Sequence, residues 1–239
     1  MNDDTRLNEW FVPKFGPVRF RAFVGLLFIP YTGMCISFVI IGSILPHAIL
    51  WDRIGAISLI YMLALGISAH AADGLGSRNI KPWGEYFSKR QLWLIIILSL
   101  VTAYSIGIYY MVLYVPLLWI VAILEGFFVF AYNLELFQGY FHNDFWFAVS
   151  WGVLPLLAGF IIQTNSISVM PLSLSAITGL VSYVEIKISR PYKELKRVSK
   201  DGHSMKRLET YLKIISLGTI AFATASIIYR ILSDHFANI

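Results

Sequence analysis

Two segments that lie far apart in the chain each end an apolar run with an acid-x-x-x-Ser-Arg pattern. The residues are Asp73, Ser77 and Arg78 in the first segment, and Glu185, Ser189 and Arg190 in the second. A carboxylate next to an arginine at the end of an apolar run offers ligands for both a cation and an anion. We therefore expect these two polar ends to face each other across one pocket at a membrane surface.

The first segment carries the larger set of polar residues. If its helix continues to the polar end, His70, Asp73 and Ser77 fall at i, i+3 and i+7 and share one helix face. Gly74 and Gly76 weaken the helix at this point. The backbone is therefore expected to loosen into a turn that lets a ligand approach.

This chemistry is suited to a magnesium ion and a phosphate-bearing ligand. Mg²⁺ commonly binds one or two carboxylates together with substrate phosphates, so Asp73, Glu185 and the neighbouring His70 are candidate metal ligands. The candidate phosphate-binding residues are Ser77, Arg78, Lys81, Ser189, Arg190 and Lys193. The simpler alternative is that Asp73 and Arg78 only finish a helix at the level of the lipid headgroups.

A further carboxyl group lies inside an apolar run. Glu125 is about 12 Å of helix rise from the nearer polar end of its segment. An ionisable residue at that depth is a candidate functional residue, because burying it without a partner is costly. The alternative is an interior carboxyl that is protonated or paired with Lys213.

Composition places the chain among membrane proteins. Of 239 residues, 57% are apolar or aromatic and 14% are charged, and the mean hydropathy is +0.68. An ordinary soluble domain is much less apolar. The single cysteine, Cys35, cannot form an intramolecular disulfide. The net charge of +5 follows from the basic loops of a membrane protein, so nucleic acid is not an expected partner.

Apolar runs of about 20 residues, the length that spans a bilayer, recur along the chain. They predict an all-α bundle of seven spanning helices in one domain, 1–239, preceded by an interfacial N-terminal arm at 1–21. The expected spans are 22–45, 53–72, 91–112, 114–133, 145–163, 169–189 and 209–232.

Basic residues are distributed unevenly over the two sides of this bundle. With seven spans, 16 Lys and Arg residues fall on the side of the N-terminus and two, Arg53 and Arg230, on the other side. The positive-inside rule then predicts a protein of the cell membrane with a cytoplasmic N-terminus and an external C-terminus. Both acid-x-x-x-Ser-Arg patterns fall on the cytoplasmic side.

The loop between the fourth and fifth predicted spans contains no Lys or Arg, which is unusual for the cytoplasmic side. A loop held over a polar pocket would explain this, and so would a tight connection. His70, Asp73, Glu135, His142 and Glu185 also offer a His/carboxylate set for a transition metal, although nothing in their spacing requires one.

The layout resembles the UbiA-type intramembrane prenyltransferases. These carry Asn-Asp-x-x-Asp-x-x-x-Asp after the second helix and Asp-x-x-x-Asp after the sixth. Here Ala69-His70-x-x-Asp73-x-x-x-Ser77 and Glu185-x-x-x-Ser189 stand in those places. Further similar features are Lys81-Pro82, Phe87-Ser88, Tyr132 and the stretch from Trp151-Gly152 to Pro155. The resemblance covers about residues 15–210.

The resemblance implies an enzyme that holds Mg²⁺ with acidic residues and ionises an isoprenyl diphosphate. The prenyl group then passes to a lipophilic acceptor. Asp73 and Glu185 would be catalytic metal ligands, and Tyr132 or Glu125 would stabilise charge deeper in the pocket. This chain departs from the family pattern, because His70, Ser77 and Ser189 stand where the family has aspartates. It also has seven predicted spans where the family typically has nine.

Two alternatives to prenyl transfer remain open. One is cyclisation of a prenyl diphosphate without an acceptor. The other is a UbiA-like protein that has lost catalysis and binds lipids or a protein partner in the membrane. The missing aspartates favour the second alternative, whereas the retained acid-x-x-x-Ser-Arg pair favours a surviving polar site.

Overall fold

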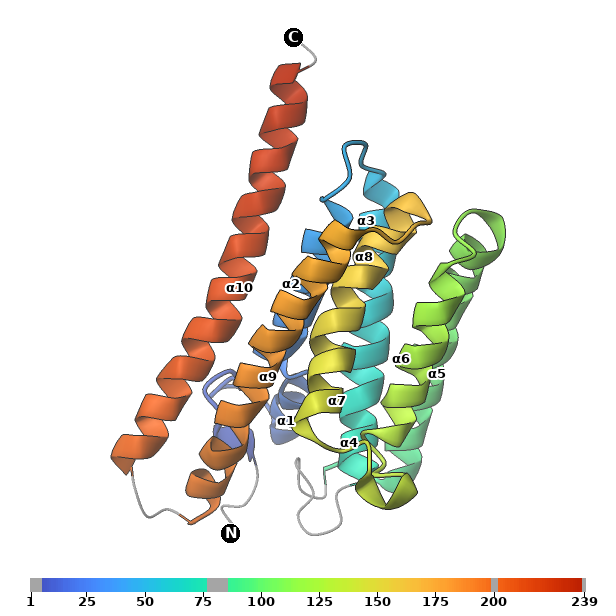
Figure 1. The fold of residues 1–239 in the computed structure, drawn as a ribbon. Helices are drawn as coiled ribbons and strands as arrows, with labels where there is room; N and C mark the ends of the chain where they lie inside the picture. The colour runs from blue at the N-terminus through green and yellow to red at the C-terminus, as the bar shows by residue number, and fades with distance from the viewer. Residues whose placement is uncertain (1–5, 77–85, 199–201, 238–239) are drawn as a thin grey trace.

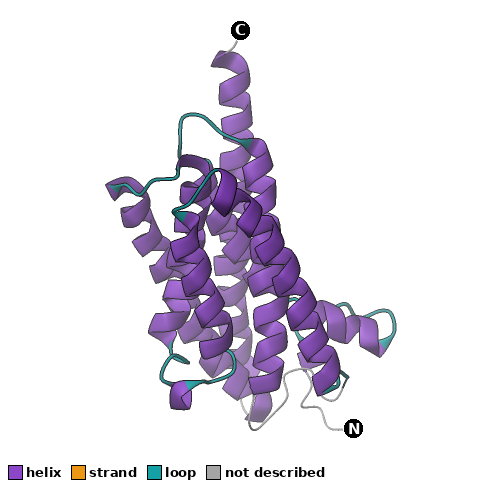
Figure 2. Cartoon of the chain, turned by 90° about the vertical axis from the view of Figure 1, so that its right-hand side faces the viewer, coloured by secondary structure: helices purple, strands orange, loops and turns teal. Residues whose placement is uncertain are grey.

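The computed structural model describes residues 6–76, 86–198 and 202–237, and all regular structure in these ranges is helical (Figures 1 and 2). The all-α prediction is therefore confirmed. The helices are η1 (Arg6–Asn8), α1 (Val18–Leu26), α2 (Ile29–Ser43), α3 (Trp51–Tyr61), η2 (Met62–Ala69), α4 (His70–Gly76), α5 (Lys89–Leu113), α6 (Leu118–Ala131), η3 (Phe137–Gly139), α7 (Asp144–Ala148), η4 (Val149–Val153), α8 (Leu154–Thr164), α9 (Val169–Val198) and α10 (Gly202–Ala237).

Six helical stretches in the described ranges are long and apolar enough to cross a membrane. They are Val18–Ser43, Trp51–Gly76, Lys89–Leu113, Asp144–Thr164, Val169–Lys196 and Gly202–Ser233. The remaining predicted span, 114–133, corresponds to α6. Its 14 residues rise only about 21 Å, less than the roughly 30 Å of a bilayer core. The described part of this membrane protein thus contains six apolar helices long enough to cross a bilayer, together with the shorter helix α6.

The two ends of the bundle carry different parts of the chain. We call the end with the N-terminus the lower end, as it is drawn in Figure 1. This end holds α4, the connection between α6 and α7, and the start of α10, while α10 finishes at the opposite end. The second, fourth and sixth predicted spans, after which the sequence predicts loops on the side of the N-terminus, therefore finish at this end of the bundle. Figure 1 also shows α10 standing at one side of the bundle, next to α9.

Side-chain capping explains where α5 begins, and a proline explains the irregular turn before α8. At the start of α5, Ser88 Oγ accepts a hydrogen bond from the Gln91 backbone N–H, and Gln91 Oε1 accepts one from the Ser88 N–H. This reciprocal cap satisfies backbone donors that a helix start leaves open. Immediately before Pro155, residues 149–153 form the π-helical turn η4. Proline lacks an N–H, and a wider turn accommodates the missing hydrogen bond.

Helices α2 and α8 cross at very short range. A Cβ atom built on Gly42 would lie 2.0 Å from the Leu156 carbonyl oxygen, and one built on Gly159 would lie 2.0 Å from the Val39 carbonyl oxygen. Ser43 Oγ donates a hydrogen bond of 3.1 Å to the Gly159 carbonyl across the crossing. Small residues of this kind let helix backbones approach each other in membranes.

The N-terminal arm packs against the lower ends of α9 and α10. Glu9 is buried, and its carboxylate accepts a hydrogen bond of 2.9 Å from Tyr192 Oη. Lys196 Nζ lies 2.9 Å from the same carboxylate. The Lys213 ammonium lies 5.1 Å from the centre of the Trp10 ring. The arm thereby ties the sixth and seventh predicted spans together at their polar ends.

Candidate functional site

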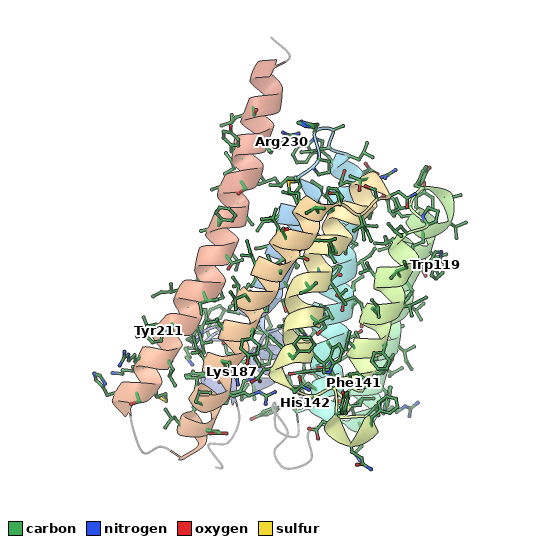
Figure 3. All side chains as sticks on the ribbon, in the orientation of Figure 1. Trp119, Phe141, His142, Lys187, Tyr211 and Arg230 are labelled. Carbon is green, nitrogen blue, oxygen red and sulfur yellow. The ribbon has the colours of Figure 1, made fainter. Side chains whose placement is uncertain are left out.

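Most of the candidate site residues that the structure describes come together at the lower end. His70 and Asp73 lie on α4, and Tyr132 directly follows α6. Glu185, Ser189, Arg190 and Lys193 follow one another along α9. Figure 3 labels Lys187 and His142 at this same end of the bundle. The acidic residues of the two patterns, Asp73 and Glu185, thus lie at the same end of the bundle although they are more than a hundred residues apart.

Tyr132 lies at the centre of this group. Its phenol interacts electrostatically with Arg190, Asp73 and Glu185. The His142 ring stacks on the phenol at 4.5 Å between ring centres, and His142 Nδ1 lies 2.9 Å from the Tyr132 carbonyl oxygen. The tyrosine is therefore held from both sides, between the loop and the charged groups of α4 and α9.

Glu185 is a buried carboxyl group with an unused oxygen. Its exposed fraction is 2%, and its Oε2 makes no hydrogen bond within the described part of the chain. Lys193, two turns further along α9, contributes a favourable charge. A buried carboxylate oxygen without a partner is costly, which marks this position as one where a cation or a donor group can bind. Ser189, one turn along, is buried as well.

His70 lies between aromatic rings. Its ring stacks on Phe28 at 4.6 Å between centres with an angle of 24°, and Trp151 lies 5.1 Å away on a tilted plane. His70 Nε2 is 3.5 Å from Thr32 Oγ1. In the described ranges, no three His, Cys, Asp or Glu residues come close enough to hold a metal ion. Among the described residues, no three of His70, Asp73, Glu135, His142 and Glu185 therefore lie together in the way that this alternative expected.

Asp144 is a residue of the site whose role the sequence did not reveal. Its carboxylate lies 2.8 Å from Lys187 Nζ and 2.8 Å from Arg190 Nε, the latter as a close ion pair without hydrogen-bond geometry. Asp144 is the first residue of α7 and ends the loop that contains no Lys or Arg. The end of this loop thus brings a carboxylate to Lys187 and Arg190, two basic residues of α9. This contact supports the interpretation of a loop held over the polar site.

The helix that carries Asp73 does not loosen before Gly76. Helix α4 continues to that residue, so the expected turn at Gly74 and Gly76 is absent from the part of the chain described here. A Cβ on Gly76 would lie 2.1 Å from the Asn133 carbonyl oxygen. The glycine therefore serves a close approach between two backbones. Ser77, Arg78 and Lys81 lie outside the described residues.

Glu125 belongs to a different part of the molecule. It lies two turns before Tyr132 on α6, where Tyr61 Oη donates a hydrogen bond of 2.9 Å to its Oε1. The alternative partner, Lys213, instead pairs with Glu209 at 2.6 Å. Glu125 lines an apolar cavity inside the bundle and is not among the charged neighbours of Tyr132. The structure therefore separates it from the group around Asp73 and Glu185.

The arrangement at the lower end places two carboxyl groups and a guanidinium near one phenol, with the Lys193 ammonium near Glu185 and the Phe28 ring. Such a site can bind an anionic head group and keep an attached apolar chain near Phe28 and Trp151. No protein-family model matches the chain, and no similar curated protein or solved structure was found.

Proposed function

We infer that this protein is an intramembrane prenyltransferase, which moves an isoprenyl group from a prenyl diphosphate to a lipophilic acceptor. One observation carries the proposal: Asp73, Glu185 and Arg190 all lie within electrostatic reach of Tyr132 at one end of a membrane bundle. An acid pair next to fixed cations fits a metal-assisted diphosphate, and the apolar helices fit the chain attached to it. The resemblance to UbiA-type enzymes leads to the same proposal.

Each residue has a role in this scheme. Arg190 and Lys193 bind the diphosphate oxygens, together with Ser189 and with Ser77, Arg78 and Lys81 outside the described ranges. Asp73 and the unpartnered Oε2 of Glu185 suit magnesium, which takes one or two protein carboxylates and completes its shell with phosphate. Bound there, Mg²⁺ would neutralise charge on the leaving diphosphate. The third predicted metal ligand, His70, is held between the rings of Phe28 and Trp151.

The chemistry follows from charge separation. The bond between the allylic carbon and the diphosphate oxygen breaks, and the diphosphate leaves with the electron pair. Arg190 and Lys193 stabilise that negative charge, as fixed cations do best in a site that excludes water. Phe28 and Trp151, whose rings pack against His70, contribute an apolar wall that would keep water from the carbocation. The acceptor then forms the new bond to carbon and loses a proton.

The test is a transfer assay in vesicles that contain the purified protein. Radiolabelled geranylgeranyl diphosphate, Mg²⁺ and a lipid extract of the host membrane are supplied, and the labelled products are separated. We expect a prenylated lipid, with the rate lowered by at least about 100-fold in Asp73→Asn, because charge stabilisation of this kind contributes several kcal/mol. The control is Asp52→Asn, whose carboxylate accepts a hydrogen bond from Tyr110 and lies on α3.

Other products would point to other functions. A labelled cyclic hydrocarbon without any acceptor would identify a cyclase. Full activity in Asp73→Asn would exclude the metal-binding role of Asp73.

One observation favours a second candidate, a non-catalytic membrane protein that binds an anionic lipid. Asp144 already pairs with Lys187 and Arg190, which leaves these cations partly neutralised. In this case the protein binds the diphosphate without releasing any product, and Mg²⁺ has no effect on affinity. The same vesicles, assayed for binding and for products in parallel, separate the two candidates.

A further inference from the structure

The loop between α6 and α7 presents apolar side chains to the outside of the molecule. The exposed residues in this stretch are Leu136, Phe137, Gln138, Tyr140 and Phe145. All except Gln138 are apolar or aromatic, and the exposed fractions of Phe137 and Tyr140 are 64% and 68%. The loop lies at the lower end of the bundle, where Figure 3 labels two of its residues, Phe141 and His142. Contiguous exposed apolar side chains of this kind mark a surface that contacts a membrane or another protein.

The short helix α6 brings this loop to the edge of the apolar layer. At the opposite end of α6, the rings of Tyr109, Tyr110 and Tyr114 pack on one another, and such aromatic residues are enriched at a membrane interface. Helix α6 begins four residues after Tyr114. It rises about 21 Å, so it ends about 9 Å before the far side of a bilayer core of roughly 30 Å. The loop therefore begins before the lower edge of that core.

The backbone of the loop forms its hydrogen bonds internally. Carbonyl groups within residues 130–141 accept hydrogen bonds from the N–H groups of Leu134, Leu136, Gly139, Tyr140, His142 and Asn143. In this fold Glu135, Phe137 and Gln138 adopt the left-handed conformation, which is costly for residues other than glycine. A loop in water can leave its N–H groups to the solvent, whereas each open group is costly in an apolar layer. The internal bonding therefore suits a loop that lies where water is scarce.

The charged groups of the loop indicate which kind of lipid surface it contacts. The loop contains no Lys or Arg, the residues that attract anionic headgroups. Its carboxyl groups are Asp144, which pairs with Lys187 and Arg190 of α9, and Glu135, which is half-buried. Neither group favours an anionic surface.

We propose that the loop of residues 133–145 is immersed in the boundary between the headgroups and the acyl chains of a neutral lipid surface. The exposed rings of Phe137, Tyr140 and Phe145 lie in that boundary, where aromatic side chains are at their most favourable. Lipid contact then holds the loop against the polar site, because Asp144 pairs with Arg190. The proposal does not rest on prenyl transfer at the lower end.

The test measures the environment of single spin labels on the full-length protein in phosphatidylcholine vesicles. Nitroxides are attached at Phe137→Cys, Tyr140→Cys and Phe145→Cys, three exposed positions that report independently, while the buried Cys35 should not react. Power saturation compares collisions with oxygen, which concentrates in the apolar layer, and with a polar nickel chelate, which stays in water.

Two further positions serve as references. Leu98→Cys on α5, where the native side chain is 66% exposed, reports the lipid environment. Gly202→Cys at the lower end of α10, where a new Cβ meets nothing within 4 Å, reports water. We expect collision with the nickel chelate to be at least about threefold lower at the loop positions than at Gly202→Cys, because a polar complex is excluded from the apolar layer. Collision with oxygen should approach that at Leu98→Cys.

Three outcomes would overturn the proposal. Nickel collision at the loop positions as high as at Gly202→Cys would place the loop in water. Low collision with both reagents would show that protein, from a partner or a second copy, covers the loop. Immersion only after phosphatidylglycerol is added would contradict a neutral lipid surface, since the expected values are the same with and without anionic lipid.

Discussion

At the scale of single residues, one hydroxyl group lets a carboxyl group lie inside the bundle. Tyr61 Oη donates to Glu125 Oε1 at 2.9 Å, and both side chains are buried. Leaving a buried polar group without its partner costs more than a hydrogen bond contributes on average. The pair should therefore show strong coupling when its members are removed one at a time.

The corresponding prediction is a double-mutant cycle. Tyr61→Phe should lower the free energy of unfolding by about 1–3 kcal/mol, because Glu125 loses its donor. In a Glu125→Leu background the same change should cost less than about 0.5 kcal/mol, since no carboxyl group remains to be satisfied. Unfolding by dodecyl sulfate in mixed micelles measures both values. Equal costs in the two backgrounds would show that the hydrogen bond does not stabilise the protein.

The sequence identified some residues of the site and missed others for a physical reason. Asp73 and Glu185 stand out because each ends an apolar run, where a charge is costly unless it has a role or a partner. Asp144 did not stand out as a partner of Arg190, because the pair joins α7 to a position far along α9. Such a contact depends on how the helices pack, which local sequence does not encode.

At the scale of helices, the crossing of α2 and α8 depends on two glycines. Gly159→Ala should lower the free energy of unfolding by about 3 kcal/mol or more, since its Cβ would lie 2.0 Å from a backbone oxygen that no rotamer change can move. Gly55→Ala on α3 is the matched control, because nothing lies within 4 Å of a Cβ there. It should stabilise the helix by up to about 1 kcal/mol. Thermal unfolding in one detergent compares the two, and equal midpoints would contradict the close crossing.

The sequence predicted the long helices more reliably than the local changes of backbone conformation within them. The apolar runs predicted six stretches that the structure confirms as long apolar helices, because helix length and hydropathy are local properties. The π-helical turn before Pro155 has a local cause. The turn expected at Gly74 and Gly76 does not occur within the described residues, where helix α4 continues to Gly76 and Gly76 lies close to the backbone at Asn133.

At the scale of the whole molecule, the basic residues predict orientation. Cys35 is buried and should not react, so single cysteines can report the two sides. Gly202→Cys lies at the start of α10 at the lower end, and Ala48→Cys lies in the connection between α2 and α3. In intact cells a membrane-impermeant maleimide should label Ala48→Cys and spare Gly202→Cys. The reverse pattern would place the polar site outside the cell.

Calorimetry shows whether Asp73 and Glu185, the acids of the two distant patterns, belong to one diphosphate site. Geranylgeranyl diphosphate is titrated into the purified protein with and without Mg²⁺, and into Asp73→Asn, Glu185→Gln and the Asp52→Asn control. We expect magnesium-dependent binding that both site variants weaken by at least about tenfold and the control leaves unchanged. Binding that is indifferent to Mg²⁺, or that is lost in only one of the two site variants, would contradict a shared site.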